Sequence, residues 1–509
     1  MKMKNKPLNW ILFPLAGLSA CSTSKKEEAV KPNILIILAD DLGYGDPGYC
    51  PTSKLNTPNI NYLAQTGLRF TRAYASSATS TPSRYALLTG SYPWRNEKAS
   101  ILPGDAPLII DTTTETLPAM LRKAGYTTGI VGKWHLGLGN GNINWNSRIS
   151  PSPNEVGFDY SFIMPATNDR VPCVYVENGY VIGLSPDDPL EVNYEKNFPG
   201  EPTALSHPQL CTKMKWHHGH NQSVHNGIPR IGFMRGGKTA LWQDETMADT
   251  FVTRAKRFIF QNRHHPFFLY LALHQPHVPR VPHPRFAGKS GLGPRGDVIL
   301  ELDWCVGEII RCLKDNNLDK NTLVIFTSDN GPVLNDGYYD EAVEKNGDHK
   351  PACYLRGGKS SLFEAGTRVP FITWWPGTIT AGVSNAMVCQ MDIIASLAGF
   401  LNMKNPSPDG ENVMDALLGK SRQGRTELLL EANGKVAYRN KDYTYIPPYE
   451  GDAVSKNTKV ETGLSKEPQL YFIQNDSSQQ HNLAAQMPEK VRYFQQRMDS
   501  ILHTGITKK

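Results

Sequence analysis

Three apolar stretches constrain the fold of this chain more than any other feature of its sequence. Residues 33–39, 266–273 and 322–327 are almost continuously apolar and rich in β-branched or aromatic side chains. Strands that are buried on both faces are typical of the centre of a parallel sheet, where helices cover both sides. Each stretch ends abruptly in polar residues, and ligands bind beyond the carboxyl ends of such strands. We therefore expect an α/β fold with its chemistry at that edge.

Helical and strand patterns alternate along most of the chain, which predicts a doubly wound sheet. The expected helices lie at 57–64, 117–124, 244–261, 298–313 and 391–401, and the further expected strands at 68–75, 127–131 and 369–375. After about residue 425 the pattern changes to short strands at 427–432, 435–439, 443–446 and 469–472, followed by a helix at 488–502. That texture predicts a small antiparallel α+β unit.

Four parts follow from this reading: a signal peptide at 1–20, a polar tether at 21–31, a main domain at 32–424 and a C-terminal α+β subdomain at 425–509. Within the main domain, residues from about 150 to 241 are rich in Pro, Gly, Asn and Asp. They predict a long insertion over the edge of the sheet, the kind of segment that carries specificity.

The N-terminus predicts export. Lysines within the first six positions precede an apolar run at 10–18, which is too short to span a membrane, and small residues lead to Cys21. The sequence Leu-Ser-Ala-Cys ending at Cys21 resembles a bacterial lipobox, in which this cysteine would be lipidated. We expect a lipoprotein of the periplasm or the outer membrane, held to the membrane only through that anchor. The alternative is a cleaved signal with an incidental cysteine.

Net charge and cysteine usage exclude some classes of protein. A net charge of +6 over 509 residues is mild and gives no reason to expect a nucleic-acid partner. After Cys21 the number of cysteines is odd, and no Cys-x-x-Cys pair suggests zinc. These cysteines are Cys50, Cys173, Cys211, Cys305, Cys312, Cys353 and Cys389. We expect mostly buried free thiols, with room for one bridge.

The stretch 80–90, Ser-Thr-Pro-Ser-Arg-Tyr-Ala-Leu-Leu-Thr-Gly, predicts the start of a helix. Pro82 is favourable at a helix N-terminus, and Ser80 is a candidate N-cap at its positive end. Such an end can hold an anion. The alternative is an ordinary capped helix.

Acidic and amide side chains follow two of the apolar stretches. They are Asp40 and Asp41 after the first, and Asp329 and Asn330 after the third. Oxygen ligands with several carboxylates suit Ca²⁺ or Mg²⁺ rather than zinc. Without a cation, carboxylates crowded in one place would repel one another. The alternative for an isolated Asp-Asp pair is a solvated turn.

Cationic and imidazole side chains occupy the loops at the same edge. They are Arg84, Lys133, His135, His277 and Lys359. Fixed cations stabilise the charge that develops on an anionic ester in its transition state. Each of these residues alone also has a structural interpretation as a surface charge or a packed strand-end histidine.

Together these motifs resemble the signature of the type I sulfatases. The resemblance rests on Ser-x-Pro-Ser-Arg from Ser80, Gly-Lys-Trp-His at 132–135, His-x-Pro-His at 274–277 and Gly-Gly-Lys at 357–359. It implies an alkaline-phosphatase-like sandwich with a large mixed, mostly parallel central sheet flanked by helices, plus a small C-terminal α+β subdomain with an antiparallel sheet. Residues 32–424 would then be the catalytic sulfatase domain.

The resemblance also implies a site. One Ca²⁺ would be bound by Asp40, Asp41, Ser80, Asp329 and Asn330, and the catalytic set would be Ser80, Arg84, Lys133, His135, His277 and Lys359. Ser80 would be oxidised to formylglycine (3-oxoalanine) by a radical-SAM anaerobic sulfatase-maturating enzyme. The hydrate of that aldehyde would attack sulfur, with His277 protonating the leaving alcohol and His135 taking a proton in the release of sulfate. His277 matches the sulfate-contacting histidine of the family better than His274 does.

The implied substrate is a sulfated carbohydrate, such as a galactose or N-acetylgalactosamine sulfate from mucin or glycosaminoglycan. Candidate substrate contacts are His274, Asn168, Asp169, Arg170 and Arg356. The histidines at 217, 218 and 220 are interpreted as part of a substrate loop rather than as a metal site.

Two other functions stay open from the sequence. A phosphatase or phosphodiesterase of the same superfamily would need two transition metals held by further His and Asp residues. A glycan-binding lipoprotein without activity would keep Ser80 unmodified.

Overall fold

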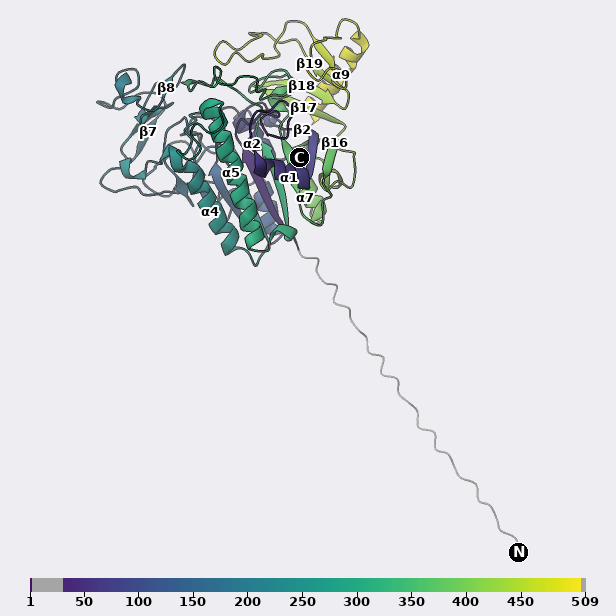
Figure 1. The fold of residues 1–509 in the computed structure, drawn as a ribbon, viewed down its shortest axis with the longest axis horizontal. Coiled ribbons are helices and arrows are strands. Elements are labelled where there is room, and N and C mark those ends of the chain that lie inside the picture. Colours follow the sequence, from purple (N-terminus) through teal and green to yellow (C-terminus); the bar gives the residue numbers. More distant parts are fainter. Residues whose placement is uncertain (2–30, 505–509) are drawn as a thin grey trace. The chain divides into compact units, whose positions relative to one another are not determined.

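The computed structural model describes residue 1 and residues 31–504 (Figure 1). The chain divides into two compact units, Met1–Lys31 and Pro32–Lys509, and every helix and strand described lies in the second. The predicted signal peptide, nearly all of the predicted tether and the lipidation at Cys21 lie outside the described residues. Within 31–504, no helix is long and apolar enough to cross a membrane.

Ten strands form one central sheet, which confirms the predicted large mixed sheet. β1 (Asn33–Ala39) runs parallel to both of its neighbours, whereas β15 (Phe371–Trp374) and β5 (Val176–Glu177) are each antiparallel to both of theirs. In spatial order the strands are β16 (Gly382–Cys389), β2 (Leu68–Tyr74), β15 (Phe371–Trp374), β13 (Thr322–Ser328), β1 (Asn33–Ala39), β12 (Phe267–Ala272), β3 (Thr127–Lys133), β4 (Tyr160–Met164), β5 (Val176–Glu177) and β6 (Tyr180–Val181).

The three apolar stretches of the sequence are neighbours in this sheet. All seven residues of β1 are buried, and Leu35 pairs with Leu269 of β12 and Val324 of β13. A strand that is apolar on both faces gains most by taking a central position, where no edge or face meets water. The three parallel strands therefore end side by side, as predicted.

Two long helices, α4 (Met247–Gln261) and α5 (Gly293–Asp315), pack side by side in front of the sheet (Figure 1). Phe251, Ala255 and Phe258 line the buried stripe of α4, which confirms the amphipathic pattern. The other helices are α1 (Pro58–Thr66), α2 (Ser80–Thr89), α3 (Leu117–Lys123), α6 (Glu364–Thr367), α7 (Asp392–Phe400), α8 (Met414–Leu417) and α9 (Pro488–Thr504).

The segment at 150–241 is not an insertion throughout. Its first strands, β4 to β6, continue the central sheet, because pairing with β3 buries the apolar side chains of β4. The rest forms short ladders: β7 (Glu191–Asn193) with β11 (Phe233–Arg235), β9 (Val224–His225) with β10 (Ile228–Pro229), and β8 (Lys215–Trp216) with β14 (Tyr338–Tyr339). Flanking prolines and glycines hid the strand character of β4 in the sequence.

Two further details differ from the expectations. β16 was not predicted, because it is a bulged edge strand whose register shifts between Ser384 and Met387 and whose burial does not alternate cleanly. The N-cap position of α2 is occupied by Thr79, so Ser80 is the first residue of the helix rather than its cap.

The C-terminal antiparallel sheet is confirmed. Its strands are β17 (Glu427–Ala432), β18 (Lys435–Asn440), β19 (Tyr443–Ile446) and β20 (Gln469–Phe472), followed along the chain by α9. A subdomain boundary at residue 425 stays a prediction.

A buried polar network joins this sheet to the central one. Arg439 of β18 donates a hydrogen bond from Nε to the Tyr74 hydroxyl at 3.1 Å, and Tyr74 in turn donates to Glu364 at 2.5 Å. The Arg439 and Glu364 side chains have no exposed area, and their charged atoms approach to 3.6 Å. Removing one member of a buried pair leaves the other charge uncompensated.

We therefore expect Arg439→Met to lower the free energy of unfolding by about 3–5 kcal/mol. Arg497→Met is the control, since Arg497 pairs with Glu427 on the surface, where its side chain is 43% exposed, and should cost under about 1 kcal/mol. Urea denaturation of the two variants and the parent measures both values. Equal losses would contradict the role assigned to the network.

Candidate active site

The carboxylates predicted to meet at the end of the sheet do meet there. Ala39 of β1 pairs with Ser328 of β13, so Asp40 and Asp329 leave adjacent strands at the same level. The backbone N–H of Asp41 donates to Asp329 Oδ1 at 3.1 Å. Asp41 has a φ of 66°, in the left-handed region, which turns the chain sharply after the strand. All three carboxylates are buried.

Each carboxylate has a cationic partner from a different element. Lys133, the last residue of β3, donates from Nζ to both oxygens of Asp40 at 2.8 and 2.7 Å. Arg84 of α2 donates to Asp329 at 2.8 and 3.1 Å. Lys359 donates to Asp41 at 2.8 Å. The structure thus brings all three predicted cations to the predicted acids.

Ser80 lies in the middle of this cluster. Its hydroxyl donates to Asp329 Oδ2 at 2.6 Å and lies 3.2 Å from Asp40 Oδ1 and 3.4 Å from Asn330 Oδ1. Lys133 Nζ donates to the same hydroxyl oxygen at 3.0 Å. The position at the first turn of α2 adds the partial positive charge of a helix N-terminus.

Burial opposes charge most strongly at Asp40. It raises the pKa of Asp40 to about 8, although Lys133 lowers it. At Asp41, burial is outweighed by Lys359 and His277, and the pKa is lowered. The cations near Asp40 do not fully offset the effect of burial on its pKa. Such a carboxylate fits a site that takes a further cation.

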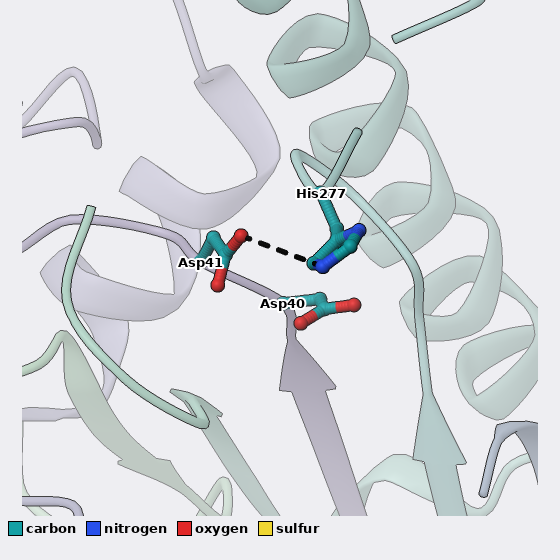
Figure 2. A group of neighbouring side chains, drawn as sticks. All are labelled: Asp40, Asp41 and His277. Carbon is teal, nitrogen blue, oxygen red and sulfur yellow. Dashed lines mark ion pairs between the residues drawn. The ribbon is translucent and has the colours of Figure 1, made fainter. Parts of the chain in front are cut away.

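Figure 2 shows Asp40, Asp41 and His277, whose ligand atoms all lie within 4.8 Å of one another. His277 follows β12, and its Nε2 lies 3.9 Å from Asp41 Oδ2. Its Nδ1 faces two acceptors, Val278 O at 2.7 Å and Asn168 Oδ1 at 3.2 Å, so Nδ1 carries a proton. Nε2 of His277, which faces Asp41, is then the nitrogen that can exchange a proton with the site.

His135 and His274 are buried and neutral, as His277 is. Burial lowers the pKa of His277 to about 4 and that of His274 to about 3, and the pKa of His135 lies well below its usual range for the same reason. His135 Nε2 lies 3.0 Å from the Leu102 carbonyl and donates to it. His135 Nδ1 is buried and has no hydrogen-bond partner in the part of the chain that the structure describes, so its lone pair accepts from no donor there.

Part of the predicted substrate set borders this site. Asn168 contacts His277, while Asp169 is held by Arg170 at 3.0 Å and by His220 Nε2 at 2.8 Å. Arg356 is placed differently: its guanidinium binds Glu461 at 2.6 Å and the Gln479 carbonyl at 2.8 Å.

A cavity of about 610 Å³ lies beyond Lys359, whose backbone N–H donates to the Pro332 carbonyl at 2.9 Å. Pro332 and Gly357 line it together with His217, Tyr339 and further residues up to Glu461. The rings of His217 and Tyr339 lie 4.9 Å apart, and Tyr339 is 63% exposed. Of the histidines at 217, 218 and 220, His217 therefore forms part of the cavity wall.

Sequence reasoning missed two groups that support the site. Asp336 accepts a second hydrogen bond from Lys359 at 2.8 Å. Glu301 of α5 accepts from Gln275 Nε2 and from the His283 backbone N–H, both at 3.0 Å. It thereby holds both ends of the loop that carries His274 and His277. An acid in a turn or in a long helix leaves no local signal of such a contact.

Comparison with known proteins gives a consistent result. The family model described as Sulfatase matches residues 32–403. An N-acetylgalactosamine-6-O-sulfatase of Bacteroides thetaiotaomicron is 49% identical, with 98% of this chain and 99% of the relative covered. Human arylsulfatase A is 32% identical over 96% of this chain and 90% of its own length.

A solved structure from work on glycosaminoglycan metabolism by Bacteroides thetaiotaomicron superposes with a TM-score of 0.91. It is 50% identical, and the match covers 92% of this chain and 99% of the other. This likeness extends to the central sheet and the C-terminal sheet together.

Glu301 makes the stability of the protein depend on pH. Burial raises its pKa from 4.5 to about 7, against the lowering effects of Gln275, His283 and Arg285, and Asp249 adds to the rise. The folded state therefore keeps a proton that the unfolded chain has lost, and this contribution to stability is lost as pH rises through 7.

Glu301→Gln is expected to gain up to about 3 kcal/mol in free energy of unfolding relative to the parent between pH 5 and 8. Glu308→Gln on the same helix is the control, because Lys256 and Arg311 lower the pKa of Glu308 despite its partial burial and no titration falls in that window. Urea denaturation across this pH range gives the difference. Parallel curves for the parent and Glu301→Gln would refute the assignment.

Proposed function

We propose, from the premise that the chain belongs to the sulfatase family and hydrolyses sulfuric esters, that its substrate is a carbohydrate sulfated on galactose or N-acetylgalactosamine. The relative at 49% identity acts, by its name, on N-acetylgalactosamine 6-O-sulfate. Mucin and glycosaminoglycan chains carry such groups. One observation supports the proposal most: the Ser80 hydroxyl lies within hydrogen-bonding distance of Asp329, Asp40 and Lys133.

One Ca²⁺ is proposed to bind among the oxygen atoms of Asp40, Asp41, Ser80, Asp329 and Asn330. The donor set fits, because it consists of carboxylates, an amide oxygen and a hydroxyl, which suit a hard cation. The raised pKa of Asp40 supports the same assignment, since a bound cation would favour its charged form. When bound, the ion would act as a Lewis acid toward anionic oxygen.

Ser80 is proposed to be the precursor of formylglycine, made by an anaerobic sulfatase-maturating enzyme. The aldehyde would supply, as its hydrate, a stronger nucleophile than an unmodified serine hydroxyl. Among the described residues, the hydrogen-bond partners of Ser80 Oγ are two carboxylates, the amide oxygen of Asn330 and the ammonium group of Lys133, and none is a histidine nitrogen.

The cations and histidines around Ser80 are proposed to position the sulfate group, to stabilise its charge and to transfer protons. Arg84 and Lys133 hold Asp329 and Asp40 and supply positive charge to the sulfate group. Lys359 does the same from the opposite side, held by Asp41 and Asp336. A bound sulfate ester would raise the pKa of His277, whose Nε2 would then donate a proton to the leaving alcohol. His135 would take a proton through its unpaired Nδ1.

Recognition of the sugar is proposed to involve the wall of the site formed by Asn168, Asp169 and Arg170, together with His274. The fixed Asp169–Arg170–His220 set offers both donors and acceptors for sugar hydroxyls. Arg356 is proposed to act at the cavity beyond Lys359 through the loop that it anchors to Glu461. Export as a lipoprotein and the division of the chain at residue 425 remain parts of the proposal.

The rival functions have less support. A two-metal phosphatase needs a second set of His and Asp ligands, yet among the described residues Asp40, Asp41 and His277 form the one group of suitable geometry. A glycan-binding protein without activity would have no need of a serine hydroxyl held among Asp40, Asp329 and Lys133.

The first test joins activity to the state of Ser80. After co-production with a radical-SAM maturase, the peptide containing Ser80 should be about 2 Da lighter through loss of two hydrogens. The protein should then release sulfate from 6-sulfated N-acetylgalactosamine, and Ser80→Ala should lose about 10³-fold or more in kcat/KM.

Ser91→Ala, a buried serine just after α2, is the control and should retain activity. Faster hydrolysis of an aryl phosphate than of any sulfated sugar would favour the phosphatase instead. A correctly modified protein that cleaves no sulfate ester would support the binding protein.

The second test concerns the metal. Ca²⁺ at a concentration 100-fold above its Kd should stabilise the parent by about 2.7 kcal/mol, seen as a rise in Tm that EDTA reverses. Asp40→Asn keeps the shape of the side chain but weakens the buried pair with Lys133, so its Tm without Ca²⁺ is measured first, and it should bind Ca²⁺ at least about tenfold more weakly. Asp249→Asn, at a surface pair with Arg285, should respond as the parent does. An equal Ca²⁺ shift in Asp40→Asn would rule out the proposed ligand set.

A further inference from the structure

Two cysteines outside the candidate active site lie against each other across two loops. Cys50 hydrogen-bonds to Thr52, and the thiols of Cys50 and Cys353 shift the pKa of each other. The Cys50 Sγ to Thr52 Oγ1 distance is 3.4 Å. Cys50 is 6% exposed, whereas Cys353 is partly accessible to solvent. Neither residue takes part in the chemistry proposed above.

The backbones of the two loops hold this pair together. Gly45 N–H donates to the Pro351 carbonyl at 2.7 Å, and Lys350 N–H reaches the Thr52 carbonyl at 3.4 Å. A Cβ atom at Gly45 would lie 2.3 Å from the Cys353 nitrogen, so only glycine permits this approach. The packing of the two loops therefore fixes the backbone of Cys353 beside the loop that carries Cys50.

The two thiols differ in reactivity. The Cys50 thiol lowers the pKa of Cys353 to about 6, with Thr52, the Tyr354 backbone and Arg368 adding to the effect against burial. The Cys353 thiol, together with burial, raises the pKa of Cys50. At neutral pH the accessible Cys353 is thus the thiolate and nucleophile, and the buried Cys50 keeps its proton.

We propose that Cys50 and Cys353 form a redox-active thiol pair, which an oxidant containing a disulfide converts into an intramolecular disulfide. This inference goes beyond the sulfatase activity and is independent of it.

The exchange takes place in two steps. The Cys353 thiolate attacks one sulfur of the oxidant, whose S–S bond breaks and releases the first thiol after it takes up a proton. Cys50 then loses its proton, and its sulfur attacks the Cys353 sulfur of the mixed disulfide and releases the second thiol. The protein loses two electrons and the one proton of Cys50, the solvent supplies the second proton, and the disulfide of the oxidant becomes two thiols.

The bridge would join two loops that reach the active site. One continues from Asp40 and Asp41, and the other leads to Lys359 and lines the cavity through Pro351 and Ala352. A bridge that closes a loop of about 300 residues strongly restricts the unfolded chain. We expect oxidation to raise the Tm by about 5 °C.

Peptide mapping of the full chain tests the proposal without any variant. The protein is reduced with dithiothreitol, freed of it, incubated with oxidised glutathione, and quenched with acid and N-ethylmaleimide before digestion. The expected product is the Cys50 peptide joined to the Cys353 peptide, about 2 Da lighter than the two reduced peptides together. Glutathione bound to Cys353 without a linked peptide, or two thiols that both react with maleimide, would overturn the proposal.

Thermal unfolding gives a second, independent readout. The parent should show the rise in Tm on oxidation, and Cys50→Ser should abolish it. Cys312→Ser is the matched control, because Cys312 has the same 6% exposure as Cys50 and lies on α5. The control should respond as the parent does, and a redox-dependent Tm retained in Cys50→Ser would contradict the assignment.

Discussion

Charge compensation at one edge of the sheet is the constraint on which the rest of this structure depends. Asp40, Asp41 and Asp329 lie together with almost no exposure to water, where unpaired charges are very unfavourable. Lys133 comes from β3, Arg84 from α2 and Lys359 from a loop more than 200 residues further on. The strands, the helix and the loop must all be in place before the acids can be buried, so folding of the core and assembly of the site are coupled.

The backbone at the strand ends is shaped to place these groups. Asp41 and His135 both have positive φ angles, of 66° and 56°. Non-glycine residues in that region are strained, and such strain collects at functional sites. Gly331, just after Asn330, approaches the Ala365 carbonyl so closely that a Cβ would lie 1.7 Å away. The chain therefore turns sharply where side chains must point back over the ends of the strands.

Around this core, the outer segments contribute in different ways. The segment after β4 supplies Asn168 and Asp169 to the border of the site, and its His217 lines the cavity. The C-terminal sheet is attached through Arg439 and its buried network. On the proposed assignment, these outer segments set the substrate class, and the core carries the hydrolysis of the sulfate ester. The loop that carries Cys50 starts at the core, and the loop that carries Cys353 lines the cavity. The thiol pair therefore lies between the core and the outer segments.

The sequence by itself determined the central strands and the polar residues that follow them. Burial on both faces leaves an uninterrupted apolar run, and the end of such a run is visible locally, as at Ala39 and Asp40. Only the tertiary structure decided which partners these residues have. The contacts of Glu301 with Gln275 and of Asp336 with Lys359 join separate elements, and a side chain that pairs across space leaves no periodic pattern along the chain. Edge strands such as β16 were hidden for the related reason that partial exposure and a bulge erase the alternation on which prediction relies.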